Sequence, residues 1–249
     1  MSSPDPLPAA IDQLYAAFVF LPRPTTIDWC HHCRSESDVA ALLKPTPLRE
    51  ISAQALRPYA AHVLTTIGDV ADFRYFLPRI LEIASTTGFP WPDLDLLTDR
   101  LHLASWSTWD VEETTAIQAL FRALWAKTLA TYPSDPDAFT ILNAIGNIRI
   151  DPAPYLHEWT ASLMRPSAAA ALLDMLRHSP LPLKRTERST DPRLHDHEAQ
   201  IARWVTSPKL RTTVAETFAT ANTEVLLQTL ADIDEELTWY PSPESYTQR

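Results

Sequence analysis

The scarcity of glycine is the feature that most constrains how this chain can fold. Only 3 of its 249 residues are glycine, whereas 22 are proline. Tight β-hairpins and phosphate-binding loops need residues with positive φ, and the chain has few residues that adopt it easily. Proline is tolerated in the first turn of a helix and in the connections between helices. The two counts together predict a protein built from many short helices.

The spacing of apolar residues supports the helical prediction. In residues 53–67 the apolar side chains recur at i, i+3, i+4 and i+7, and residues 69–86 repeat the pattern. Asp69 stands where an N-cap is expected, and Pro78 inside the second stretch predicts a kink or a short break. No stretch alternates as a strand does. Helices are predicted over 9–20, 37–44, 53–67, 69–86, 93–105, 110–131, 136–147, 153–164, 167–178, 194–206, 208–220 and 223–238.

These elements predict an all-α fold. We expect an irregular array of about twelve short antiparallel helices, similar to helical-repeat proteins and without a sheet. The predicted domain organisation is a main helical body over 9–178, a basic exposed loop over 179–193 and a C-terminal three-helix block over 194–238. The loop has no apolar periodicity and contains Lys184, Arg185 and Arg188. The C-terminal block is expected to pack on the main body as one domain.

The net charge and the absence of known motifs reduce the number of possible functions and partners. The formal net charge of −10 predicts a basic protein as the partner, and no nucleic acid. No stretch approaches 18 consecutive apolar residues and the first 22 residues lack Lys or Arg before their apolar run, so no membrane is expected and the predicted location is cytoplasmic. The motifs GxGxxG, GxxxxGK, GxSxG and HExxH are all absent from the sequence.

The stretch TTIDWCHHCRSESD, residues 25–38, carries both cysteines of the chain, Cys30 and Cys33. A C-x-x-C pair is the usual half of a tetrahedral zinc site, so zinc is the cofactor to test. The other ligands would come from distant histidines, with His195 and His197 as candidates, or from Asp28 or Glu36 nearby. Alternatively, the two residues are partly buried free thiols, because the neighbouring Ile27 and Trp29 can bury the turn.

A redox role is the third interpretation of the pair. His32 directly precedes the second cysteine, and a neighbouring histidine can favour a thiolate. The chain lacks the βαβ pattern of a thioredoxin fold. All-helical alkylhydroperoxidase-like proteins follow their C-x-x-C with a histidine four residues later, where this chain has Ser37.

A helix stop and a helix start meet at Gly68 and Asp69. We predict a tight corner there, in which Thr66 and Asp69 bond to the backbone. A functional alternative is that Asp69, Asp72 and Arg74 line a binding site.

Three segments resemble a family of bacterial proteins without an assigned activity. They are WCHHC, LKPTPLREISAQALRPYA and LTTIGDVADFRYFLPRILEIA, and the resemblance spans roughly residues 10–130. The family carries a similar C-x-x-C followed by PLREL-like and TTxGDxxDFxxFLPRxLE-like segments. The resemblance implies an all-helical fold and a place for Cys30 and Cys33 in the family framework, without implying a role for them.

The functional expectation is a non-enzymatic helical module that binds another protein. The absent catalytic motifs, the paired helices and the acidic charge support it, and an acidic inhibitor or adaptor for a basic partner is its concrete form. The alternatives are a thiol oxidoreductase that uses the Cys30–Cys33 pair, or a regulator stabilised by zinc. On this basis the chain is expected not to be an enzyme.

Overall fold

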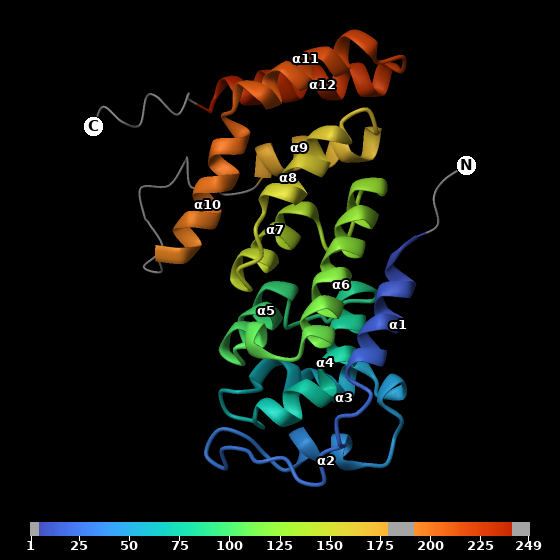
Figure 1. Ribbon diagram of the computed structural model, residues 1–249, viewed down its shortest axis with the longest axis vertical. Coiled ribbons are helices and arrows are strands. Elements are labelled where there is room, and N and C mark those ends of the chain that lie inside the picture. The colour runs from blue at the N-terminus through green and yellow to red at the C-terminus, as the bar shows by residue number, and fades with distance from the viewer. Residues whose placement is uncertain (1–4, 179–191, 241–249) are drawn as a thin grey trace. The chain divides into compact units, whose positions relative to one another are not determined.

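The computed structural model of the protein describes residues 5–178 and 192–240, and in these ranges it contains twelve α-helices and no sheet (Figure 1). The predicted all-α class is therefore confirmed. The antiparallel direction of the helix pairs stays a prediction. The chain divides into two compact units, Met1–Leu124 and Trp125–Arg249. None of the described helices combines the length and the apolarity needed to cross a membrane.

The first unit holds five helices from start to end and the first part of a sixth. They are α1 (Leu7–Ala17), α2 (Ser37–Leu43), α3 (Ala53–His62), α4 (Val70–Ser85), α5 (Leu94–Leu103) and the beginning of α6 (Val111–Ala130), with the short 3-10 turns η1 (Leu48–Glu50) and η2 (Trp106–Thr108). Helix α4 contacts both α1 and α3, and α3 also contacts α2 and α5. The apolar stripe of α4, which includes Phe73, Phe76 and Ile80, is fully buried and forms the centre of this core.

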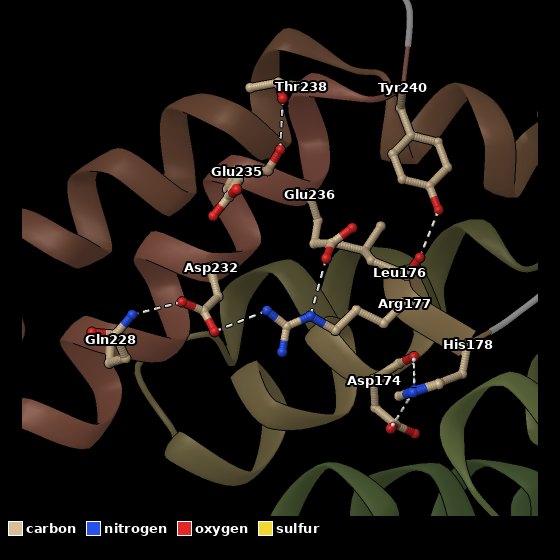
Figure 2. A network of polar contacts seen from close by, with 10 residues as sticks. All are labelled: Asp174, Leu176, Arg177, His178, Gln228, Asp232, Glu235, Glu236, Thr238 and Tyr240. Atoms are coloured by element: carbon tan, nitrogen blue, oxygen red, sulfur yellow. Dashed lines mark hydrogen bonds and ion pairs between the residues drawn. The ribbon is translucent and has the colours of Figure 1, made fainter.

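The second unit continues α6 and adds α7 (Ala138–Asn147), α8 (Ala153–Ala161), α9 (Pro166–His178), α10 (Pro192–Val205), α11 (Pro208–Thr220) and α12 (Glu224–Thr238). Helix α12 packs on α9 and α11, and α10 packs on α7 and α8 (Figure 1). Figure 2 shows ion pairs between two helices of this unit. Arg177 of α9 pairs with Asp232 at 2.9 Å and with Glu236 at 3.0 Å, and both acidic residues are on α12.

Indole rings fill the core of the second unit. Trp125 meets Trp159 edge-to-face with centroids 5.2 Å apart, and Trp159 stacks on Trp204 at 5.3 Å. Each indole N–H has a partner, since the three donate to the carbonyl of Tyr155, the carbonyl of Ala168 and the hydroxyl of Thr160. These three indoles therefore pack together with their polar N–H groups satisfied. Trp239, in contrast, is 72% exposed.

Several helix boundaries differ from the sequence prediction. Helix α3 ends at His62 and not at 67, because the chain turns through a left-handed residue, Leu64 with φ 66°. Helix α1 ends at Ala17 and not at 20. Helix α4 begins after Asp69 as predicted. It continues through Pro78, so the short break given as one possibility at this proline does not occur. Most of the predicted basic loop, residues 179–191, lies outside the described residues.

Candidate functional site

A tight corner between α3 and α4 supports the candidate site. Gly68 has φ 63°, and a Cβ there would lie 3.0 Å from the Tyr59 ring and 3.1 Å from Asp72 Oδ2. Only glycine combines this conformation with so little space. The predicted corner at Gly68 is confirmed, and Asp69 caps α4 by accepting from the amide of Asp72. The threonine hydroxyl that bonds the backbone is that of Thr65 and not that of Thr66 as predicted.

The C-x-x-C segment is attached to this corner by main-chain hydrogen bonds. The amide of Cys30 donates to the carbonyl of Thr66 at 2.8 Å, and the amide of Gly68 donates to the carbonyl of Asp28 at 2.7 Å. Between them, Trp29 and Ile67 form an isolated antiparallel bridge. The guanidinium of Arg34 adds a bond from Nε to Thr66 Oγ1 at 3.2 Å. The corner therefore holds both ends of the cysteine turn.

The two thiols lie at the surface and in contact with each other. Cys30 and Cys33 are both exposed and free, and their Sγ atoms are 3.4 Å apart. The turn between them is closed by the amide of Cys33, which donates to the carbonyl of Cys30 at 2.9 Å. The interpretation of the pair as partly buried thiols is therefore wrong. Ile27 is buried as expected, but it does not cover the sulfur atoms.

The surroundings make the two thiols chemically different. In the dithiol the Cys30 thiol donates to Cys33. When Cys30 ionises, the Cys33 thiol becomes the donor, and this bond, with the amides of His32 and Cys33, lowers the pKa of Cys30. The same contact raises the pKa of Cys33, because its proton is held by the Cys30 thiolate. The charge of Arg34 favours the thiolate form of both residues. Cys30 is consequently the thiol of the pair that loses its proton more readily.

The remaining ligands of the predicted zinc site do not gather at the thiols. Across residues 5–178 and 192–240, no group of three or more His, Cys, Asp or Glu side chains is placed to hold a metal ion. His197 is buried in the second unit, where its ring bonds the carbonyl of Leu142 and contacts Gly146. The side chain of His195 lies outside the described part of the chain. Zinc binding by Cys30 and Cys33 stays a prediction.

The predicted binding residues Asp69, Asp72 and Arg74 separate into two environments. Asp69 and Asp72 form a reciprocal capping box at the start of α4. Burial raises the pKa of Asp72 to about 6, and the charges of Asp69 and Asp28 act in the same direction. Arg74 lies elsewhere: its Nη2 contacts both carboxylate oxygens of Glu113, at 2.7 and 2.6 Å. Arg74 is thus occupied by an ion pair with α6, whereas the two aspartates lie beside the cysteine segment.

Sequence reasoning missed the two residues that position the dithiol, Arg34 and Thr66. Both are separated from their partners by about thirty positions in the chain, and no local motif reports such a contact. The all-α fold and the exposed C-x-x-C turn define the class: a helical protein with a surface dithiol. No family model, curated protein or solved structure matches the chain.

Proposed function

We propose that the protein is a cytoplasmic thiol-disulfide redox module in which Cys30 and Cys33 exchange with disulfide substrates. The observation that carries the proposal is the exposed pair of sulfur atoms, 3.4 Å apart on an anchored turn. A disulfide requires about 2.05 Å between the sulfur atoms, so a small movement of the turn closes the bond. In a reducing compartment such a pair is more often catalytic or redox-sensing than structural.

The reaction follows from the different pKa values of the two thiols. The Cys30 thiolate attacks one sulfur of a substrate disulfide, forms a mixed disulfide and releases the other half as a thiolate. Cys33 then loses its proton and attacks the Cys30 sulfur, which releases the second half of the substrate. The substrate gains two electrons and becomes two thiols, while the pair becomes a Cys30–Cys33 disulfide. A cellular thiol reductant returns the pair to the dithiol.

Reaction with oxidised glutathione tests the proposal. The wild type should form the internal disulfide, whereas Cys33→Ser should accumulate a mixed disulfide on Cys30, as detected by mass spectrometry. Cys30→Ser should react more slowly at pH 7, because the amides of His32 and Cys33 lower the pKa of Cys30 and no amide does so for Cys33. As a control, the rates of the two single variants should approach each other in denaturant. Equal rates in the folded state, or two glutathione adducts on the wild type, would contradict the proposal.

A second candidate function is the non-enzymatic acidic module for a basic protein partner, and the exposed face of α12 favours it. Trp239, the C-cap of α12, is 72% exposed and Val225 near its start is 71% exposed. Helix α12 also carries the exposed acidic residues Glu224, Asp234 and Glu235. An exposed aromatic side chain four positions after the carboxylate of Glu235 suits Arg or Lys side chains, which combine charge with cation-π contact.

Titration with an arginine-rich peptide tests this second function. Binding should weaken with added salt and on Trp239→Ala, and a glutamate-rich peptide of the same length should not bind. Asp12→Asn, which removes an exposed carboxylate in the first unit, shows how much the loss of one charge outside α12 weakens binding. If Trp239→Ala and Asp12→Asn bind the peptide equally well, the face of α12 is not the binding surface.

A further inference from the structure

A pocket of about 420 Å³ lies in the second unit, far along the chain from the cysteines. Its lining comes from the end of α6, the connection to α7, the start of α7 and the last turns of α9. The lining residues are Thr128, Tyr132, Pro133, Ser134, Asp137, Ala138, Phe139, Ala171, Asp174, Met175 and His178. A volume of this size suits a small molecule.

Carboxylates supply the charge of this pocket. Asp137 and Asp174 both line it, and no Lys or Arg is among the described residues that do so. The carboxylate of Asp137 is occupied in capping α7, where it accepts from the amide and the hydroxyl of Thr140. The carboxylate of Asp174 caps no helix, and its partner is His178, which lines the same pocket. The net negative charge of the lining favours a cation.

Neighbouring side chains hold the Asp174 carboxylate in place. His178 Nδ1 lies 3.0 Å from Asp174 Oδ1, one turn along α9. Tyr132 lies near this carboxylate, and burial together with the charge of Asp174 raises the pKa of Tyr132. Figure 2 shows that Asp174 and His178 point away from α12, whereas Arg177 reaches it. Asp174 is therefore not neutralised by the arginine that follows it on the same helix.

Apolar and aromatic groups complete the lining. Met175, Ala138 and Ala171 are buried and form an apolar floor, and the aromatic residues Tyr132 and Phe139 lie at the more exposed part. Carboxylates with aromatic rings and a soft apolar floor are the groups that recognise alkylammonium ions. Two other hollows of this unit differ, because their linings include Arg149 in one and Arg203 and Lys209 in the other.

We propose that this pocket binds a small organic cation with an ammonium head group. The head group lies against the Asp174 carboxylate and the aromatic residues Tyr132 and Phe139, and its alkyl part contacts Met175. The proposal does not depend on the redox chemistry of Cys30 and Cys33, because every lining residue belongs to the other unit.

Calorimetric titration with choline tests the proposal. The matched control ligand is the uncharged isostere of choline, in which a carbon atom replaces the nitrogen. Choline should bind saturably, and the isostere should bind at least about tenfold more weakly, because only the charged head group is attracted by Asp174. Equal binding of the two ligands would show an apolar pocket without charge recognition and would overturn the proposal. The absence of saturable binding for choline, butylammonium and tetramethylammonium alike would also overturn it.

Variants separate the pocket from the general acidity of the protein. Asp174→Asn should weaken choline binding by about tenfold or more, and Tyr132→Ala should weaken it more than Tyr132→Phe, which keeps the ring. Asp232→Asn removes one carboxylate from α12, outside the pocket, and should leave the affinity unchanged. Circular dichroism confirms that each variant is folded. If Asp174→Asn and Asp232→Asn change the affinity equally, the cation is attracted by net charge alone and the pocket is not its site.

Discussion

The amide of Cys30 donates a 2.8 Å hydrogen bond to the carbonyl of Thr66. This bond joins the cysteine turn to the corner between two helices, and Arg34 bonds the hydroxyl of the same threonine. The dithiol is thus held by a rigid part of the fold although the thiols themselves are at the surface. Positioning of this kind is what a reactive surface group requires, because a loose turn would not keep the two sulfur atoms in contact.

Arg34 should add to the reactivity of Cys30 through its charge, after the larger effects of Cys33 and the two amides. Arg34→Gln should raise the pKa of Cys30 and slow its alkylation at pH 7, because a cation that stabilises the thiolate is lost. Thiolate absorbance as a function of pH measures the shift. Thr66→Val is the matched control, since it removes the side-chain acceptor of Arg34 but keeps the charge and the Thr66 carbonyl. A larger pKa rise in Thr66→Val than in Arg34→Gln would show that anchoring matters more than charge.

Gly68→Ala should lower the free energy of unfolding more than Gly88→Ala. Both glycines have positive φ, at 63° and 71°, so each substitution introduces backbone strain of about 1 kcal/mol. The Gly68 Cβ also meets the Tyr59 ring at 3.0 Å, whereas nothing lies within 4 Å of a Cβ at Gly88. Chemical denaturation of the two variants therefore isolates the effect of crowding at the corner. Equal losses of stability would contradict the close packing of Tyr59 on Gly68.

Gly146→Ala should destabilise the second unit, although alanine is the better helix former. A Cβ at Gly146 would lie 2.6 Å from Cδ2 of His197, so the buried His197 ring, or α7 and α10 themselves, would have to move. We expect a loss of about 1–3 kcal/mol, as for other overpacked sites. The double variant Gly146→Ala/His197→Ala removes the clash, so denaturant titration should show that Gly146→Ala costs less in that background. An equal cost in both backgrounds would contradict this packing.

Arg74 and Glu113 should be strongly coupled. Glu113 is 3% exposed, and Arg74 also lies over the Trp109 ring at 5.2 Å. Arg74→Met leaves a buried carboxylate without its partner and should cost about 3 kcal/mol or more. Arg74→Met/Glu113→Leu should recover much of this loss. The exposed pair Arg49–Asp12 is the control, and Arg49→Met should cost less than about 1 kcal/mol. A double-mutant cycle by denaturant titration measures both pairs, and a similar coupling energy in the two would contradict the prediction.

Asp72 should make stability depend on pH in an unusual direction. Its pKa is raised to about 6 from 3.8, so between these values the folded state binds the proton more tightly than the unfolded state does. The contribution of Asp72 to stability therefore decreases as pH rises through this window. The melting temperature of Asp72→Asn, compared with that of wild type from pH 4 to 7, isolates the effect. A difference that is flat across this range, or that favours the wild type increasingly as pH rises, would contradict it.

The sequence by itself determined the helical architecture, because the signals for helices are local. The period of the apolar residues, the N-cap at Asp69 and the glycine at position 68 each act within one or two helical turns, and the structure confirms what they predict. The predicted end of α3 at residue 67 was wrong, since the helix ends at His62. The apolar pattern continues past His62 because Val63 and Ile67 are buried, although in a corner and not in a helix.

Only the tertiary structure decided how the chemical groups are arranged. The C-x-x-C motif showed where a dithiol could form, but its exposure and its anchor on Thr66 depend on contacts between distant segments. The pocket around Asp174 likewise combines residues from three helices, with spacings that follow no periodic pattern. Such contacts form when buried surfaces pack, and packing depends on the shapes of all the neighbouring side chains together. Local sequence patterns do not determine how those shapes fit together.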